Sequence, residues 1–208
     1  MPSPDFDLYL VTDRNQTHSR DLLWVLQQAL DGGVKAIQLR EKDLGGKDLF
    51  ILAERTRVLC RQYTARLFIN DRVDVALAVD ADGVQLGKTS IPIQTARELL
   101  GRQKMIGAST HSLAEAEEAQ QSGADFILFG PVYFTPSKAS YGEPQGLTQL
   151  KKIVEKISLP VYAIGGVNFA NVKEARRTGI RGAALISAIV SAEDPREATQ
   201  TILQLLNG

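Results

Sequence analysis

A polar loop in the second half of the chain carries residues that could hold an anion. The apolar run Phe126 to Phe129 predicts a short buried strand, and Gly130-Pro131 ends it. The polar stretch that follows is about fifteen residues long and includes Thr135, Ser137 and Lys138. Lysine supplies a positive charge and the hydroxyls supply hydrogen-bond donors, so this stretch is suited to binding an anion such as phosphate. A surface loop without a ligand is the alternative that the stretch alone leaves open.

Short apolar runs alternate with longer amphipathic stretches along the whole chain. The runs predict strands at Leu8–Thr12, Lys35–Arg40, Arg66–Asn70, Gly83–Leu86, Lys104–Ala108, Asp125–Gly130, Pro160–Gly165 and Gly182–Ser187. Helical patterns lie at Ser19–Asp31, Lys47–Gln62, Arg72–Val79, Ile93–Leu100, Leu113–Ser122, Leu147–Lys156, Asn168–Arg177 and Pro195–Leu206. Each run is apolar on both faces, as parallel strands covered by helices must be. The pattern predicts an α/β protein, a single (β/α)₈ barrel domain over residues 1–208. A doubly wound open sheet is less favoured, because the first β-α turn has no glycine-rich phosphate loop.

Polar residues follow the predicted strands, and a parallel barrel gathers such residues on one face. They are Thr12, Asp13, Gln38, Arg40, Glu41, Lys42, Asn70, Asp71, Ser90, Ser109, His111, Thr135, Ser137 and Lys138. We expect the cations of this set, Arg40, Lys42 and Lys138, to converge with the carboxylate of Asp71. Such a carboxylate is either part of an internal ion pair or a Mg²⁺ ligand that faces a phosphate. A solvated pair with Glu41 is the alternative for Arg40.

A glycine pair after the seventh predicted strand is a second candidate for phosphate binding. Gly165 and Gly166 lie where barrels often hold a phosphate on backbone N–H groups, and Ser187 ends the neighbouring strand. Asn168 is placed to cap the next helix. A tight turn would explain the two glycines equally well if they stood alone.

His111 has two interpretations that the sequence leaves open. It precedes a helical pattern in which Ser112 can act as N-cap and Glu115 can complete a capping box, so it can be a histidine at a helix start. It can also be a general acid or base at the carboxyl end of a strand.

The composition excludes several classes of protein. Lys and Arg together number 24, as do Asp and Glu, so the formal charge is zero and gives no support for a nucleic-acid or membrane partner. With 1 Cys and 2 His, neither a disulfide framework nor a Cys/His zinc site is expected. The start of the chain has no pattern of a signal peptide, and no apolar stretch is long enough to cross a membrane. We expect a cytoplasmic protein.

Six ordered motifs resemble one family over almost the whole chain. They are QLREK (38–42), INDRVDVALAVDADGVQLG (69–87), IGASTHS (106–112), FGPVYFTPSK (129–138), YAIGGV (162–167) and LISAI (185–189). Together they resemble the thiamine-phosphate synthase and thiazole tautomerase family, whose members are compact (β/α)₈ barrels. A synthase of this family joins hydroxymethylpyrimidine diphosphate to hydroxyethylthiazole phosphate and releases pyrophosphate, which leaves before the thiazole nitrogen captures the pyrimidine cation.

The resemblance also implies roles for single residues. Gln38 would face the pyrimidine and Asp71 would bind Mg²⁺ as the cofactor. The leaving pyrophosphate would be held by Arg40, Lys42, Asn70, Ser109 and Lys138. The pocket for the thiazole phosphate would be lined by Thr135, Ser137, Gly166, Ile186 and Ser187. The partners are then two small molecules, and a homo-oligomer is an open expectation.

One departure from the family pattern affects the metal site. Synthases usually carry a second magnesium carboxylate after the fourth strand, whereas this chain has Gly87-Lys88-Thr89-Ser90 there. Ser90 would be a weaker, neutral ligand. The tautomerase branch is similar to the chain at this point and uses a histidine at the position of His111 to move protons, so it stands as the alternative. A third hypothesis is a non-catalytic regulator that binds a thiazole phosphate. The chain keeps the residues that are expected to hold pyrophosphate and Mg²⁺, and their presence favours the synthase.

Overall fold

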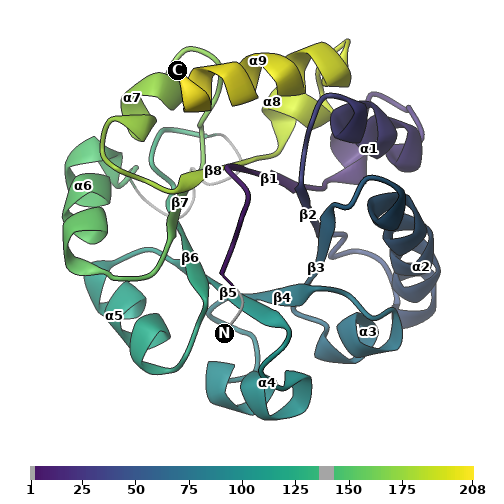
Figure 1. Ribbon diagram of the computed structural model, residues 1–208, viewed down its shortest axis with the longest axis horizontal. Coiled ribbons are helices and arrows are strands. Elements are labelled where there is room, and N and C mark those ends of the chain that lie inside the picture. The colour runs from purple at the N-terminus through teal and green to yellow at the C-terminus, as the bar shows by residue number, and fades with distance from the viewer. Residues whose placement is uncertain (1–2, 136–142) are drawn as a thin grey trace.

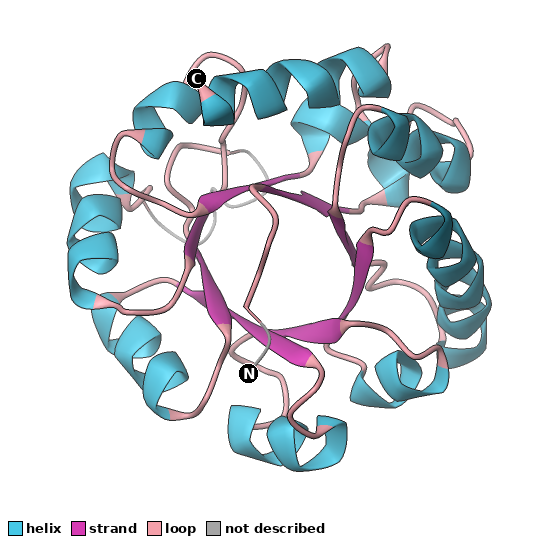
Figure 2. Ribbon diagram, viewed as in Figure 1, coloured by secondary structure: helices cyan, strands magenta, loops and turns pink. Residues whose placement is uncertain are grey.

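The protein is a closed barrel of parallel strands surrounded by helices, as the sequence predicts. The computed structural model describes residues 3–135 and 143–208. Each strand pairs in parallel with the next, and the last strand closes the ring by pairing with the first. Figures 1 and 2 show the ring of strands inside the ring of helices. The strands are β1 (Leu8–Val11), β2 (Ala36–Leu39), β3 (Arg66–Asn70), β4 (Gly83–Leu86), β5 (Met105–Thr110), β6 (Phe126–Phe129), β7 (Val161–Ile164) and β8 (Gly182–Leu185).

The helices follow the predicted order with two additions. They are α1 (Leu22–Asp31), α2 (Gly46–Gln62), α3 (Val73–Ala78), α4 (Ile93–Leu100), α5 (Leu113–Gln121), α6 (Gly146–Lys156), α7 (Val172–Arg176), α8 (Ser187–Val190) and α9 (Pro195–Asn207). The 3₁₀ turn η1 (Arg14–Gln16) and the short α8 were not predicted. None of the described helices is long and apolar enough to cross a membrane.

Helix α7 begins at Val172, so the predicted start at Asn168 is wrong. The side chain of Asn171 accepts a hydrogen bond from the backbone N–H of Asn168 at 2.8 Å, and the side chain of Asn168 accepts one from Ala170 at 2.9 Å. These bonds hold the chain in a turn before the helix, because Asn side chains satisfy backbone groups that a helix would otherwise use.

A cluster of aromatic rings fills the amino-terminal part of the barrel interior. Phe6 comes from the segment before β1, which crosses the ring of strands in Figure 1. Its ring stacks on Tyr9 and Tyr162 at centroid distances of 5.4 and 5.1 Å, and it meets Phe68 and Phe126 edge-on. The Tyr162 hydroxyl also donates to the carbonyl oxygen of Phe6 at 2.7 Å. These rings fill the interior of the barrel at its amino-terminal end, so a ligand cannot enter the barrel interior from that end.

Candidate functional site

The ends of β3 and β4 bring Asp71 and Ser90 together. Asn70 pairs in register with Gln85, so the residues that follow the two strands are neighbours. The Ser90 hydroxyl is hydrogen-bonded to Asp71 Oδ1 and accepts a bond from the backbone N–H of Gly87 at 2.6 Å. Asn70 Nδ2 donates to the other oxygen of Asp71 at 3.2 Å. Ser90 thus faces Asp71 directly.

A cavity of about 250 Å³ opens between the ends of β2 and β3. Its lining consists of Leu39, Glu41, Lys42, Leu44, Leu49, Asn70, Asp71 and Arg72. Lys42 and Asp71 are therefore brought together as predicted, and Arg40 lies just after β2 at the same end of the barrel. Over residues 3–135 and 143–208, neither Arg40 nor Lys42 has a carboxylate within ion-pair distance. Their positive charges are available to a ligand.

Glu41 does not form the pair with Arg40 that the sequence left open. Its side chain is buried, with 4% of the residue exposed. The Thr12 hydroxyl donates to it at 2.5 Å, and the backbone N–H of Arg14 donates at 3.1 Å. The Thr12 hydroxyl also accepts from the backbone N–H of Arg40 at 2.9 Å, so the end of β1 holds the backbone that carries this cation.

Burial raises the pKa of the Glu41 carboxyl above its ordinary value of 4.5, although Thr12 and Arg14 oppose the shift. A carboxyl whose pKa is raised by folding contributes stability below its unfolded pKa and loses it as the pH rises through the folded pKa. We therefore expect the free energy of unfolding of wild type, relative to Glu41→Gln, to fall as the pH rises from 4.5. Urea unfolding of both proteins over a series of pH values measures this.

Asp43→Asn is the control for this experiment. Asp43 also contacts Arg14, but the pKa of its carboxyl is shifted in the opposite direction. Its hydrogen bond with Arg14 lowers the pKa of the Asp43 carboxyl. The Asp43 contribution is present above the unfolded pKa and disappears as the pH falls. Parallel curves for wild type and Glu41→Gln would show that the buried carboxyl does not titrate as expected.

Gln85 lies beneath Ser109, and the sequence did not single it out. Strand β5 runs on to Thr110, so Ser109 lies within the strand and not after it, as the predicted end at Ala108 implied. Gln85 Nε2 donates to Ser109 Oγ at 3.0 Å. Gln38 is also in the barrel, 2% exposed, and its Nε2 has no hydrogen-bond partner among the described residues. The run GVQL has the pattern of an apolar strand, so the contact between Gln85 and Ser109 is known only from the structure.

His111 links the end of β5 to the end of β6. Its Nδ1 lies 2.5 Å from the carbonyl oxygen of Gly130, and its backbone N–H donates to Glu115 at 2.7 Å. The hydroxyl of Ser112 caps α5 by accepting from the N–H of Glu115 at 3.2 Å, which confirms Ser112 as the N-cap. The predicted capping box is wrong, because the Glu115 carboxylate accepts from His111 and not from the N–H of Ser112. A carbonyl only accepts, so Nδ1 carries the proton and Nε2 of the neutral ring is the acceptor. The role of acid or base stays a prediction.

The glycine pair after β7 packs against the start of the β6–α6 loop. Gly165 and Gly166 have φ of 88° and 69°, which favour glycine. A Cβ on Gly165 would lie 2.5 Å from Pro131, and the Gly165 carbonyl accepts from the N–H of Tyr133 at 3.0 Å. Ile164 pairs with Ala184, so the residues after β7 and β8 are neighbours. The turn thus contacts the residues directly after β6 and also forms one side of the mouth.

Ser187 begins helix α8 and does not belong to the last strand, which corrects the predicted end of that strand. The chain leaves β8 at Ile186 because Ile189 and Val190 bury their side chains in a helical turn. Ile186 itself packs against the interior cluster, while Ser187 is exposed at the mouth. Thr135 is half-buried and is the last residue described before the gap. Ser137 and Lys138 lie outside the described residues.

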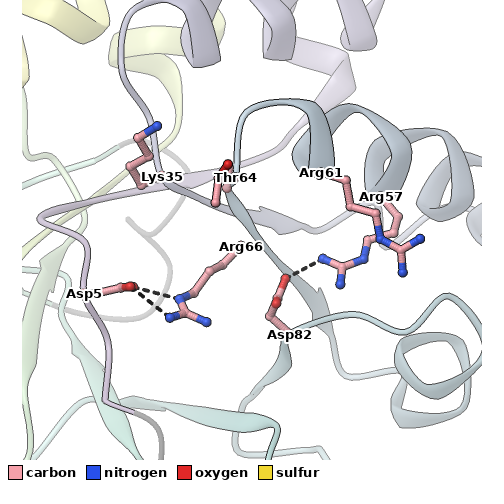
Figure 3. Close-up of a pocket in the computed structure, with 8 residues that line it drawn as sticks. Asp5, Lys35, Arg57, Arg61, Thr64, Arg66 and Asp82 are labelled. Carbon is pink, nitrogen blue, oxygen red and sulfur yellow. Dashed lines mark hydrogen bonds and ion pairs between the residues drawn. The ribbon is translucent and has the colours of Figure 1, made fainter.

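A second cavity, of about 360 Å³, lies on the side of the residues that precede β2, β3 and β4. Figure 3 shows its side chains. Arg57 pairs with Asp82 at 2.6 Å and Arg66 with Asp5 at 2.7 Å, so these guanidinium groups already have carboxylate partners. The contrast with Arg40 and Lys42 places the candidate site at the mouth of the barrel.

Within the described part of the chain, no cluster of three His, Cys, Asp or Glu side chains could hold a metal ion. A cation at the mouth would need oxygen atoms from a ligand as well as from the protein.

Comparisons with known proteins show the family to which this chain belongs. The family model described as thiamine monophosphate synthase matches residues 8–189. A relative from Geobacter sulfurreducens is 53% identical over 99% of this chain and 97% of its own, and its name gives the synthase activity as provisional. A thiamine-phosphate synthase from Syntrophomonas wolfei is 42% identical over 99% of this chain and 98% of its own. The thiamine phosphate pyrophosphorylase structure from Pyrococcus furiosus is 43% identical in sequence and has a TM-score of 0.89. The match covers 97% of this chain and 96% of that structure's chain. A model match over most of the barrel and relatives this similar along their full length show that the chain belongs to the thiamine monophosphate synthase family.

Proposed function

We propose that this protein is a thiamine-phosphate synthase, a transferase of thiamine biosynthesis. It joins hydroxymethylpyrimidine diphosphate to hydroxyethylthiazole phosphate and releases pyrophosphate. The observation that carries the proposal is the full-length membership of the family, with the site of unpaired cations at the mouth of the barrel as its chemical counterpart. The bond between the pyrimidine methylene carbon and the diphosphate oxygen breaks, and its electron pair leaves with pyrophosphate. The lone pair of the thiazole nitrogen then forms the new carbon–nitrogen bond.

This reaction asks the protein to stabilise a leaving anion and to align two rings. We assign the anion to the side chains of Arg40, Lys42, Asn70 and Ser109. Arg40 and Lys42 have no carboxylate partner in the described residues, so their charge can be used by pyrophosphate. We assign the pyrimidine to Gln38, whose buried amide nitrogen has no hydrogen-bond partner in residues 3–135 and 143–208. Lys138 has the same expected role as Lys42, from sequence alone.

The thiazole phosphate is assigned to the opposite part of the mouth. Gly166, Ile186 and Ser187 follow two paired strands there, and Thr135 begins the polar loop. Backbone N–H groups and a hydroxyl suit a phosphate, and an apolar side chain such as Ile186 suits a thiazole ring. Gly165 shapes the turn, and Ser137 stays a prediction from the sequence.

The residues at the mouth fit Mg²⁺ as the cofactor. Asp71 offers a carboxylate beside Ser90, and Mg²⁺ takes one or two carboxylates and completes its shell with water and phosphate oxygens. Asp71 would hold the ion, with Ser90 as a neutral neighbour. When bound, Mg²⁺ would neutralise charge that develops on the leaving pyrophosphate. A cytoplasmic location and a homo-oligomer stay predictions.

A coupling assay with both half-substrates, with and without Mg²⁺, tests the proposal. We expect thiamine phosphate and pyrophosphate to form only with Mg²⁺. The second candidate is the thiazole tautomerase, which Ser90 favours and in which His111 would act as the acid or base. Absence of coupling at saturating Mg²⁺, together with tautomerisation that is lost in His111→Ala, would establish the tautomerase instead. Binding of thiazole phosphate with neither activity would identify a regulator.

Replacing Ser90 by Asp should strengthen Mg²⁺ binding about tenfold, because a second charged oxygen would lie opposite Asp71. The same pair of carboxylates should repel each other and lower the thermal stability of the metal-free protein. The Mg²⁺ dependence of coupling and of the melting temperature measures both effects. Ser90→Asn is the matched control, because asparagine is neutral and similar in size to aspartate. Equal Mg²⁺ dependence in the two variants would show that residue 90 does not face the metal.

A further inference from the structure

The carboxamide of Gln85 is held rigidly in the barrel, directly below Ser109. Gln85 is 1% exposed and lies on β4, paired in register with Gly107 of β5. A Cβ on Gly107 would collide with Gln85 Oε1 and lie 2.5 Å from the ring of Phe126. Gly107 thus leaves the space that the carboxamide occupies, and Phe126 bounds that space. The amide has little freedom to turn.

The two ends of this carboxamide have different surroundings. Nε2 donates to Ser109 Oγ at 3.0 Å, whereas Oε1 is buried and has no hydrogen-bond partner in the described residues. A buried acceptor without a partner costs stability, and an apolar residue of similar shape would avoid that cost. The glutamine is therefore a poor choice for packing alone. Such a local conflict is typical of residues that serve a function.

The bond to Gln85 determines which way the Ser109 hydroxyl can act. A serine hydroxyl has one proton and two lone pairs. Gln85 uses a lone pair by donating, so the proton of Ser109 stays available to another acceptor. Ser109 is half-buried at the carboxyl end of β5, on the face that carries Arg40 and Asp71. An acceptor in the mouth would receive this proton as a hydrogen bond.

We propose that Gln85 is a positioning residue that orients the Ser109 hydroxyl as a donor toward the leaving pyrophosphate. The inference rests on the proposed function, in which Ser109 contacts that group. A preorganised donor stabilises the anion as its charge develops, so the effect belongs to turnover more than to binding of the thiazole substrate.

Two substitutions separate this role from packing. Gln85→Leu removes the donor and the unpaired acceptor together, so kcat for coupling should fall about tenfold while the melting temperature stays equal or rises. Gln85→Glu places an acceptor under Ser109 that turns its proton away from the mouth and adds negative charge, so kcat should fall about a hundredfold. The KM for the thiazole phosphate should change little in both variants.

A double-mutant cycle with Ser109→Ala tests whether Gln85 acts through the serine. Gln85→Leu should have no further effect on kcat when Ser109 is already alanine, because the group that it orients is gone. Gln120→Leu is the matched control, since Gln120 also bonds a serine, Ser158, on the helical shell at 2.8 Å. It should leave coupling unchanged.

Calorimetric titration with inorganic pyrophosphate and Mg²⁺ provides a readout without turnover. Gln85→Glu should weaken pyrophosphate binding at least tenfold, and Gln120→Leu should not change it. If the wild type binds pyrophosphate but does not couple, the proposed function fails while the role of Gln85 is still measured. Additive losses in the cycle, or a Gln85→Glu variant as active and as tight as wild type, would overturn the inference.

Discussion

Asp71→Asn is expected to lower kcat/KM for coupling by about 10²–10³-fold, because it removes the charge that would hold Mg²⁺ against the leaving pyrophosphate. The substitution should not disturb the backbone. Asp71 has φ of 63°, a conformation that asparagine also adopts readily, and its bonds with Asn70 and Ser90 can be replaced by those of a carboxamide. Steady-state coupling rates over a range of Mg²⁺ concentrations measure the loss.

Asp74→Asn is the matched control, since it makes the same chemical change three residues further along the chain. Asp74 lies in the first turn of α3, and its side chain is exposed and paired with Arg72 at 2.5 Å. Its removal should leave the Mg²⁺ dependence of coupling unchanged. Equal losses in the two variants would mean that coupling depends on the total negative charge near the start of α3, and that Asp71 has no specific role as a metal ligand.

Phe6→Ala should lower the free energy of unfolding by about 3–5 kcal/mol, the largest effect on stability that we expect. Phe6 is 2% exposed and contacts the other rings that fill the amino-terminal part of the barrel. Those rings come from four different strands, so they cannot all move to close the space that the phenyl group leaves. Chemical unfolding with urea, followed by fluorescence and circular dichroism, measures the change.

Phe134→Ala serves as the control for the loss of a phenyl ring. Phe134 is 67% exposed, so its replacement should change stability by less than about 1 kcal/mol. A Phe6→Ala protein as stable as Phe134→Ala would show that the amino-terminal segment does not contribute to the core. An intermediate value would mean that the segment before β1 is displaced and that water fills the end of the barrel.

The alternation of short apolar runs with amphipathic stretches determined the fold of this protein. Each run is too short for a helix and is apolar on both faces, so it can only be a strand covered by helices. The predicted strand ends then showed which polar residues follow each strand. From this came the prediction that Asn70, Asp71 and Lys42 meet at one end of the barrel. The motif QLREK, together with five others in the correct order, indicated the family.

The partners of individual side chains were decided by the tertiary structure alone. Thr12 meets Glu41 across 29 residues, Gln85 meets Ser109 across 24, and Ser90 meets Asp71 across 19. Local sequence patterns report which face of an element is apolar, but these contacts depend on the register and tilt of neighbouring strands. The sequence could therefore place Glu41 at the mouth without showing that it turns into the protein to bond Thr12. It could not single out Gln85, because the run GVQL does not show that this side chain faces into the barrel or that its carboxamide bonds Ser109.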